Sequence, residues 1–126
     1  MFTDAHAFSG FSVNDVTTAK KFYGEVLGLR VSEQNGMLNL HLAGGGEVLA
    51  YPKDDHTPAS FTILNFPVED IDSAVEELNR RGIEMIRYEG FHQDSKGIAR
   101  SDGENGPDIA WFTDPAGNVL SVLQGK

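Results

Sequence analysis

The feature that most constrains the fold of this chain is an internal repeat. Residues 11–29 read FSVNDVTTAKKFYGEVLGL, and their first half returns 55 positions later as FPVEDIDSA over residues 66–74. A second match pairs GEVL at 46–49 with GNVL at 117–120, at an offset of 71. A chain that matches itself at both ends of a unit indicates two copies of that unit. The two offsets differ by 16, which predicts 16 additional residues in the second copy, within 89–106.

Composition narrows the classes of function. The formal net charge of −9 repels phosphate backbones and anionic membrane surfaces, so we expect neither a nucleic-acid partner nor a membrane partner. No segment approaches the ~20 apolar residues of a membrane span, and the first residues lack the pattern of a signal peptide. The absence of cysteine excludes disulfides and thiolate metal sites.

The first copy reads as strand, helix and three strands. Residues 7–13 alternate as a strand, Asp15 is an N-cap, and apolar residues then recur at helical spacing as far as Gly28. Further strands are predicted at 29–34, 37–42 and 47–51, the first two joined by the turn-forming pair Asn35-Gly36.

The second copy repeats this order after a polar linker. We expect a strand at 61–68, a helix from the N-cap Asp70 to Gly82, a strand at 83–88 and a hairpin of 108–113 with 118–123. The prediction is a single domain over 1–126, with module one at about 7–52, a linker at 53–60 and module two at about 61–124.

These signatures resemble the vicinal oxygen chelate superfamily, which includes glyoxalase I, bleomycin-resistance proteins and extradiol dioxygenases. The resemblance implies an α+β fold in which two βαβββ modules form a curved mixed sheet, or cup, with helices on the outer face. It also implies a cytoplasmic homodimer that binds small molecules inside the cup. The motifs that carry it are Val13-Asn14-Asp15, Phe22-Tyr23, Leu27-Gly28-Leu29 and Asp114-Pro115-x-Gly117-Asn118.

Enzymes of that superfamily hold a divalent metal with His, Gln or Glu side chains. The matching positions here are Phe8 and Ile63 on the first strand of each module, Ser121 on the last strand, and its repeat partner Ala50. Three of these side chains have no lone pair, and a neutral serine is a poor ligand for such ions. We therefore predict a protein without a metal or any other cofactor.

The same positions suggest a largely apolar ligand site. Trp111 lies three residues before Asp114, at a position where members of this family often place a residue that lines the cup. Leu40 is its repeat partner, and Ile109 lies two residues before Trp111 on the same strand. The long insertion adds Phe91 as an apolar lid, His92 or Lys96 as a polar contact, and glycines, Gly103 among them, for hinged closure. The predicted ligand-binding residues are Phe8, Leu40, Ala50, Ile63, Ile109, Trp111, Ser121 and His92.

The remaining histidines and serines give weaker signals. His6, two residues before Phe8, is the best candidate for a displaced metal ligand, although a frayed terminal histidine is the favoured interpretation. His56 in the linker is expected to be solvated. His41 lies opposite the leucines of its strand and matches Phe112 in the repeat, which suggests a packing role on the outer face. No serine stands in a nucleophile elbow or near a spaced histidine–carboxylate signature, so a serine nucleophile is not expected.

Three functions stay open from the sequence. The first is a metal-independent protein that binds a small apolar or aromatic molecule in the cup. The second is a lyase, isomerase or dioxygenase-like enzyme with a displaced metal or a loop acid/base such as His92. The third is a non-catalytic interaction domain with a filled cup.

Overall fold

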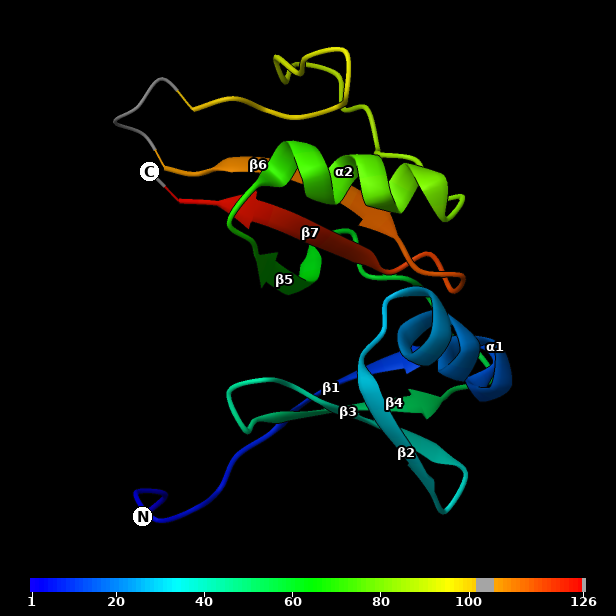
Figure 1. The fold of residues 1–126 in the computed structure, drawn as a ribbon. Helices are drawn as coiled ribbons and strands as arrows, with labels where there is room; N and C mark the ends of the chain where they lie inside the picture. Colours follow the sequence, from blue (N-terminus) through cyan, green and yellow to red (C-terminus); the bar gives the residue numbers. More distant parts are fainter. Residues whose placement is uncertain (102–105, 126) are drawn as a thin grey trace. The chain divides into compact units, whose positions relative to one another are not determined.

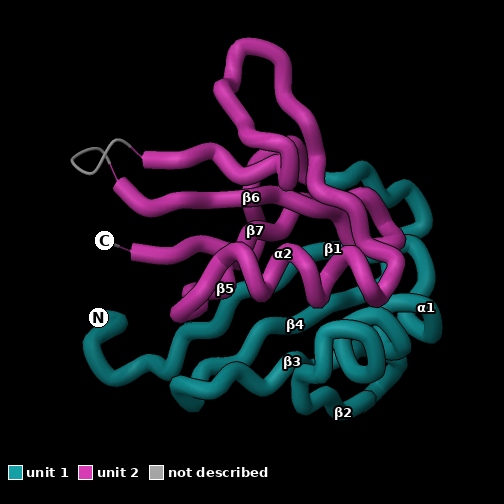
Figure 2. The backbone as a smooth tube through the Cα atoms, turned by 45° about the horizontal axis from the view of Figure 1, so that its top comes forward, with its two compact units in different colours: residues 1–58 teal, residues 59–126 magenta. Residues whose placement is uncertain are grey.

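A computed structural model describes residues 1–101 and 106–125, and the predicted hinge glycine Gly103 lies outside them. The chain divides into two compact units, residues 1–58 and 59–126 (Figure 2). The boundary falls inside the predicted linker. Each unit combines helix and sheet, so the fold is α+β as predicted. Among the described residues, no helix has both the length and the apolar character needed to cross a membrane.

The first unit contains a four-stranded mixed sheet in the order β1-β4-β3-β2 (Figure 1). β1 (Ser9–Val13) runs parallel to β4 (Glu47–Pro52), whereas β3 (Met37–His41) is antiparallel to both β4 and β2 (Arg30–Gln34). The strands β2, β3 and β4, which follow the helix in the chain, thus form an antiparallel meander. The strand β1, which precedes the helix, pairs with the last of them, β4. This is the βαβββ order predicted for module one.

The helix of the first unit begins as predicted but changes its winding. Asp15 caps α1 (Val16–Lys20) by accepting the Thr17 N–H at 3.1 Å. The chain then continues as the π-helical segment η1 (Lys21–Val26), and the Leu27 N–H donates to the Phe22 carbonyl at 2.9 Å. A π-helical turn inserts an extra residue into the helix. Gly28 ends it with a φ of +78°, as the sequence indicates.

The core of the first unit lies between this helix and one face of the sheet. Tyr23 is fully buried, and its ring centroid lies 5.8 Å from that of Phe11 in β1. Ala50 in β4 pairs with Phe11 of β1 and with Leu38 of β3, so all three side chains share the face below the helix. Leu40, two residues after Leu38, lies on that face as well and is fully buried.

The second unit contains a three-stranded mixed sheet covered by one helix (Figure 1). β7 (Val119–Gln124) is central, parallel to β5 (Thr62–Pro67) and antiparallel to β6 (Asp108–Thr113). α2 (Ile71–Arg80) follows β5. The Gln124 side chain accepts the Ile71 N–H at 2.8 Å, which identifies its face of β7 as the one that packs against α2.

The strand predicted at 83–88 does not form, so the second unit is βαββ and not βαβββ. Only the Ile86 N–H reaches β6, where it donates to the Trp111 carbonyl at 2.7 Å. The amide of Gln93 explains the difference: it donates to the Ile86 carbonyl at 2.9 Å and accepts the Tyr88 N–H at 2.8 Å. A side chain thereby takes up backbone groups that a strand would pair with a neighbouring strand.

The two hairpin turns show that the later strands repeat at an offset of 72, not 71. The Leu42 N–H donates to the Gly46 carbonyl in the first unit, and the Asp114 N–H donates to the Asn118 carbonyl in the second, each at 2.9 Å. Gly45 and Gly117 take the positive φ angles, 92° and 85°. Relative to the offset of 55 at the first strand, the insertion is therefore 17 residues.

The inserted segment is tightly hydrogen-bonded where the structure describes it. The Asp94 carboxylate accepts the Lys96 and Ile98 N–H groups at 2.9 and 3.0 Å, and Ile98 is fully buried. Gly97 has a φ of +86°, and a β-carbon there would stand 2.7 Å from the Met85 β-carbon. We conclude that Gly97 is required for both its backbone conformation and its closeness to the preceding segment.

Gly97→Ala is expected to destabilise the protein more than Gly90→Ala, which serves as a matched control. Both glycines have positive φ angles, +86° and +84°, but nothing lies within 4 Å of a β-carbon at Gly90. Both variants incur the left-handed penalty of about 1–2 kcal/mol. Gly97→Ala adds a steric cost of about 1–3 kcal/mol. Urea unfolding measures the difference, and equal midpoints would contradict it.

Candidate functional site

An aromatic cluster lies on the face of the second sheet that points away from α2. Trp111 in β6 alternates with Ala110 and Phe112, which are buried on the α2 side. The Trp111 ring makes edge contacts with Tyr88 and Phe91, each with centroids 5.4 Å apart. Phe91 is 57% exposed. The sequence-predicted Trp111 thus stands with two further aromatic rings, one of which faces solvent.

Beside the tryptophan lies a single polar pair. Ser121 in β7 is directly opposite Trp111, and its hydroxyl contacts the Asn65 side-chain oxygen in β5 at 2.6 Å. Ser121 is fully buried, whereas Asn65 is exposed. Ile109 lies two residues from Trp111 on the same face and is half-buried. The face therefore offers aromatic and aliphatic surface with the Asn65 amide at its polar side.

The inserted segment holds Phe91 against Trp111. Gln93, two residues after Phe91, bonds both to the Ile86–Tyr88 backbone and to the Gly97 carbonyl, the last at 2.7 Å. Ala99 pairs with Ile109 in an isolated antiparallel bridge. The segment is thus held to the 86–88 backbone through Gln93 and to β6 through Ala99, and these two attachments determine the side on which Phe91 lies.

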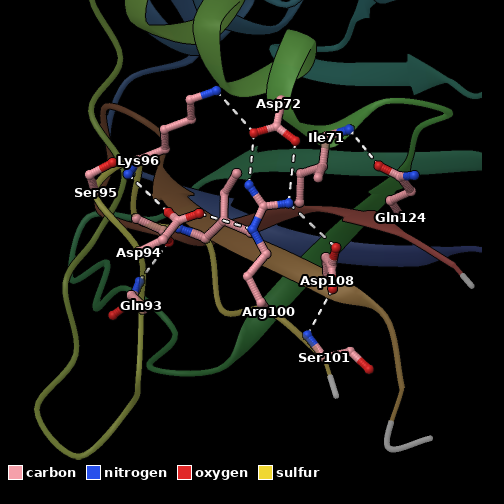
Figure 3. Close-up of polar contacts among 12 residues, drawn as sticks. Ile71, Asp72, Gln93, Asp94, Ser95, Lys96, Arg100, Ser101, Asp108 and Gln124 are labelled. Carbon is pink, nitrogen blue, oxygen red and sulfur yellow. Dashed lines mark hydrogen bonds and ion pairs between the residues drawn. The ribbon is translucent and has the colours of Figure 1, made fainter. Parts of the chain in front are cut away.

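On the α2 side, an ion cluster ties the same segment to the helix (Figure 3). Arg100 donates to Asp72 of α2 at 2.7 Å and to Asp94 at 2.9 Å, and its guanidinium lies 3.5 Å from Asp108 of β6. The Lys96 ammonium adds a contact to Asp72 at 3.0 Å. Because Asp108 shares its face with Gln124, the cluster lies on the helix side, and the aromatic cluster lies on the other.

These contacts lower the pKa of Asp72. Hydrogen bonds from Arg100 and then Lys96 bring it from an ordinary 3.8 to about 2. Burial would by itself raise the pKa of Asp94, but the Ile98 N–H and the Arg100 guanidinium reverse this, so the net shift is downward. Both carboxyl groups are therefore charged at neutral pH and able to hold the two cations.

The other predicted site residues are spread over the two units. Phe8 precedes β1 and is 67% exposed. Ile63 lies at an irregularity of the β5–β7 register and is half-buried. His92 is exposed in the inserted segment beside Phe91.

Leu40 and Ala50 were placed on the wrong face by the repeat register. With an offset of 72, the partner of Trp111 is Asn39 and the partner of Ser121 is Leu49. Asn39 and Leu49 pair with each other on the face away from α1, whereas Leu40 and Ala50 face the helix and are fully buried. A slip of one residue moves every side chain of a strand to the opposite face.

The residues at the superfamily's metal positions do not fit a metal ion. Phe8 and Ile63 have no donor atom, the corrected partner position holds Leu49, and the Ser121 hydroxyl is engaged with Asn65. Divalent ions of this class bind imidazole, carboxylate or carbonyl oxygen. Within residues 1–101 and 106–125, no group of three or more His, Asp or Glu side chains is arranged to hold a metal.

The first unit carries polar contacts that the sequence analysis missed. The His41 ring lies between Ser32 of β2 and Glu47 of β4, with contacts of 2.8 and 3.0 Å. His56, expected to be solvated, contacts the Ser12 hydroxyl at 2.6 Å. The sequence did contain a signal for the contacts of His41: Ser32, His41 and Glu47 lie on the same face of three consecutive strands. The offset of 71 hid this signal, because it matched His41 with the buried Phe112.

Asp72→Asn is expected to loosen the inserted segment at neutral pH. The stability that the Asp72 charge contributes is present above its ordinary pKa of 3.8 and is lost as the pH falls toward about 2. The variant should show faster hydrogen exchange at the Lys96 and Ile98 amides, and its difference from the wild type should vanish near pH 2.

Glu77→Gln is the matched control for this change. The pKa of Glu77 is also lowered to about 2, but its partners Arg80 and Arg81 belong to the end of the same helix. Its removal should leave exchange at Lys96 and Ile98 unchanged. Equal exchange in both variants would show that Asp72 does not hold the segment.

Comparison with known proteins agrees with this architecture. A glyoxalase family protein from Enterococcus faecalis is 26% identical, with 98% of this chain and 99% of that chain covered and a TM-score of 0.68. The fosfomycin resistance protein FosX from Listeria monocytogenes is 14% identical, with 95% and 92% covered and a TM-score of 0.71. TnmS3, an antibiotic binding protein from Streptomyces sp. CB03234, is 22% identical, with 98% and 99% covered and a TM-score of 0.68.

Comparison of the sequence with known proteins identifies a family but no individual curated protein. A search of curated proteins found no match to this chain. The family model described as "Glyoxalase/Bleomycin resistance protein/Dioxygenase superfamily" matches residues 5–122, which is nearly the whole chain. Together with the α+β architecture of its two units, this match shows that the chain belongs to the glyoxalase/bleomycin resistance protein/dioxygenase superfamily.

Proposed function

We propose that this protein binds a small, planar, largely aromatic molecule without a metal, against the aromatic cluster of its second unit. One observation carries the proposal: Trp111, Tyr88 and Phe91 form a contiguous group of rings, and Phe91 is more than half exposed. Exposed aromatic surface next to a few polar groups is typical of sites for small molecules.

The geometry favours a flat ligand over a compact aliphatic one. The Trp111 ring meets Tyr88 and Phe91 edge to face, at 82° and 61°, and the Tyr88 and Phe91 rings are tilted by 55°, so no pair is stacked in parallel. A planar ligand extends such a cluster through the offset or edge contacts that aromatic rings prefer. The exposed Asn65 amide, held by Ser121, would give one hydrogen bond to a ring substituent.

The expected affinity is modest. Burial of ~100 Å² of apolar ligand surface contributes about 2.5 kcal/mol before the cost of association. Contacts from the inserted segment, which includes the exposed His92 next to Phe91, would add to this. The acidic surface, with a net charge of −9, disfavours anionic ligands, so neutral or cationic aromatic compounds are the expected class.

The superfamily supports this choice over the alternatives. One structural neighbour, TnmS3, is described as an antibiotic binding protein, so this fold accommodates a binding function. The donor-poor side chains at Phe8, Ile63 and Ser121 argue against the family's metal chemistry. The family resemblance also implies a cytoplasmic location and a homodimer, and both stay part of the proposal. Light scattering tests the homodimer.

A planar aromatic compound should quench the fluorescence of Trp111, which is the only tryptophan of the chain. We suggest titration with 1-nitronaphthalene, with decalin as a bicyclic aliphatic comparison. Phe91→Ala should weaken binding about tenfold, because an aromatic contact contributes about 0.5–1.5 kcal/mol beyond its area. Ser121→Asp should abolish the quenching because it places a charge beside the tryptophan, while circular dichroism shows that the variant is folded.

Phe61→Ala is the control for general loss of aromatic surface. Phe61 belongs to the same unit and is 70% exposed, comparable to Phe91 at 57%. The Phe61→Ala variant should bind the compound as tightly as the wild type does. If Phe91→Ala and the wild type bind equally, or if decalin competes as well as a flat compound, the aromatic cluster is not the site and a filled, non-binding core is favoured.

Metal analysis of protein purified without chelators tests the second half of the proposal. We expect less than stoichiometric nickel, zinc, manganese and iron, and ligand quenching that EDTA does not change. A stoichiometric metal together with activity on hemithioacetals or catechols would overturn metal independence and favour the enzyme alternative.

A further inference from the structure

Three side chains on the first sheet form a line of polar contacts from a hydroxyl to a carboxylate, one a hydrogen bond and the other an ion-pair contact. The Ser32 Oγ lies 2.8 Å from His41 Nε2, and His41 Nδ1 lies 3.0 Å from Glu47 Oε1. Serine and carboxylate therefore contact opposite nitrogens of one imidazole. This is the arrangement by which hydrolases of unrelated folds activate a serine, and it is identified by geometry and not by sequence order.

The strand register places the three residues on one face. His41 is directly opposite Glu47 in the β3–β4 pair, and Ser32 is opposite Asn39, two residues before His41, in the β2–β3 pair. These positions alternate with Leu38 and Leu40, which face the helix, so all three point away from α1. They come from three consecutive strands of a meander, which is a rigid support for a site.

The ion-pair contact with Glu47 favours one tautomer of His41. A carboxylate oxygen offers only lone pairs, so the Glu47 oxygen 3.0 Å away favours a proton on His41 Nδ1. A neutral imidazole then has its lone pair on Nε2, which accepts the proton of the Ser32 hydroxyl. Glu47 thus selects the tautomer in which His41 is a base toward Ser32.

The serine is accessible to a reagent, and an arginine shares its face of the sheet. Ser32 is exposed, and the His41 side chain is 37% exposed. Arg30 precedes Ser32 by two residues on β2 and is directly opposite His41, so it occupies the same face. A guanidinium on that face favours the negative charge that develops on a carbonyl oxygen under attack.

We propose that Ser32 is a nucleophile activated by His41 and Glu47, and that it accepts acyl groups from activated esters. The Ser32 oxygen attacks the carbonyl carbon while His41 Nε2 takes the hydroxyl proton. The carbon–oxygen bond to the leaving group breaks, and the leaving group receives that proton. Water then attacks the acyl-serine with the same base, which releases a carboxylic acid and restores Ser32. Ser32, His41 and Glu47 belong to the first unit, whereas the aromatic cluster belongs to the second.

The test is acetylation by 4-nitrophenyl acetate, followed by release of 4-nitrophenol and by the mass of the intact chain. We expect one acetyl group per chain, located on Ser32 by peptide mapping. Ser32→Ala should lose it. His41→Gln should slow acetylation at least about a hundredfold, because general-base assistance contributes roughly 10²–10⁴-fold.

Glu47→Gln distinguishes an activated serine from a merely exposed one. The amide that replaces the carboxylate can donate to His41 Nδ1, which moves the ring proton to Nε2 and removes the base. Acetylation should therefore slow although Ser32 and His41 are both present, while circular dichroism shows an intact fold. Ser9→Ala, at the exposed start of β1, should change nothing.

Several results would overturn the proposal. Acetylation of Ser12, which contacts His56, or of lysines in place of Ser32 would assign the reactivity elsewhere. Equal rates in the wild type and Glu47→Gln would show that the carboxylate does not set the tautomer. If the wild type forms no acetylated chain and also releases 4-nitrophenol no faster than Ser32→Ala, then Ser32 is not activated.

Discussion

The last hairpin of each unit, β3–β4 in the first and β6–β7 in the second, determines which side chains face the helix. The two clusters of polar and aromatic side chains on the sheets depend on this choice of face. In the second unit the Asp114 carboxylate accepts the Ala116 and Asn118 N–H groups, each at 2.9 Å, while Asp114 and Asn118 also pair through their backbones. Asp114 and Asn118 are buried, so this turn has little freedom to shift. Since side chains alternate along a strand, the turn decides that Phe112 faces α2 and that Trp111 faces away.

The same constraint separates two kinds of chemistry on β6. Its α2 side carries Asp108, which takes part in the ion cluster with Arg100 and Asp72, and its other side carries Trp111. The inserted segment reaches both sides: Arg100 binds the helix, and Phe91 packs on the tryptophan. The electrostatic contacts on one face therefore position the aromatic surface on the other. The proposed ligand site depends on residues that a ligand would not touch.

The sequence predicted the elements well because the signals were local. Asp15 and Asp70 both cap helices, Gly28 and Gly82 both take positive φ angles, and the Asp-Pro turn forms where expected. The strand at 83–88 was wrongly predicted, because its apolar pattern was compatible with a strand while the side chain that satisfies its backbone, Gln93, lies in the insertion. A contact of this kind has no local signature.

The faces of the strands were harder to predict than the strands. The Gly-x-Val-Leu match aligned Gly117 with Gly46, but the glycine with the same backbone conformation is Gly45, one residue earlier. This single step assigned Leu40 and Ala50 to the wrong face and made His41 look like a packing residue. The faces of Trp111 and Ser121 were not affected, because these residues were positioned by counting from the Asp114 turn of their own unit. Their partners Leu40 and Ala50 were positioned through the repeat. In a repeated β-unit, the turn hydrogen bonds and not the best letter match define equivalent positions, and here they place Ser32, His41 and Glu47 on one face.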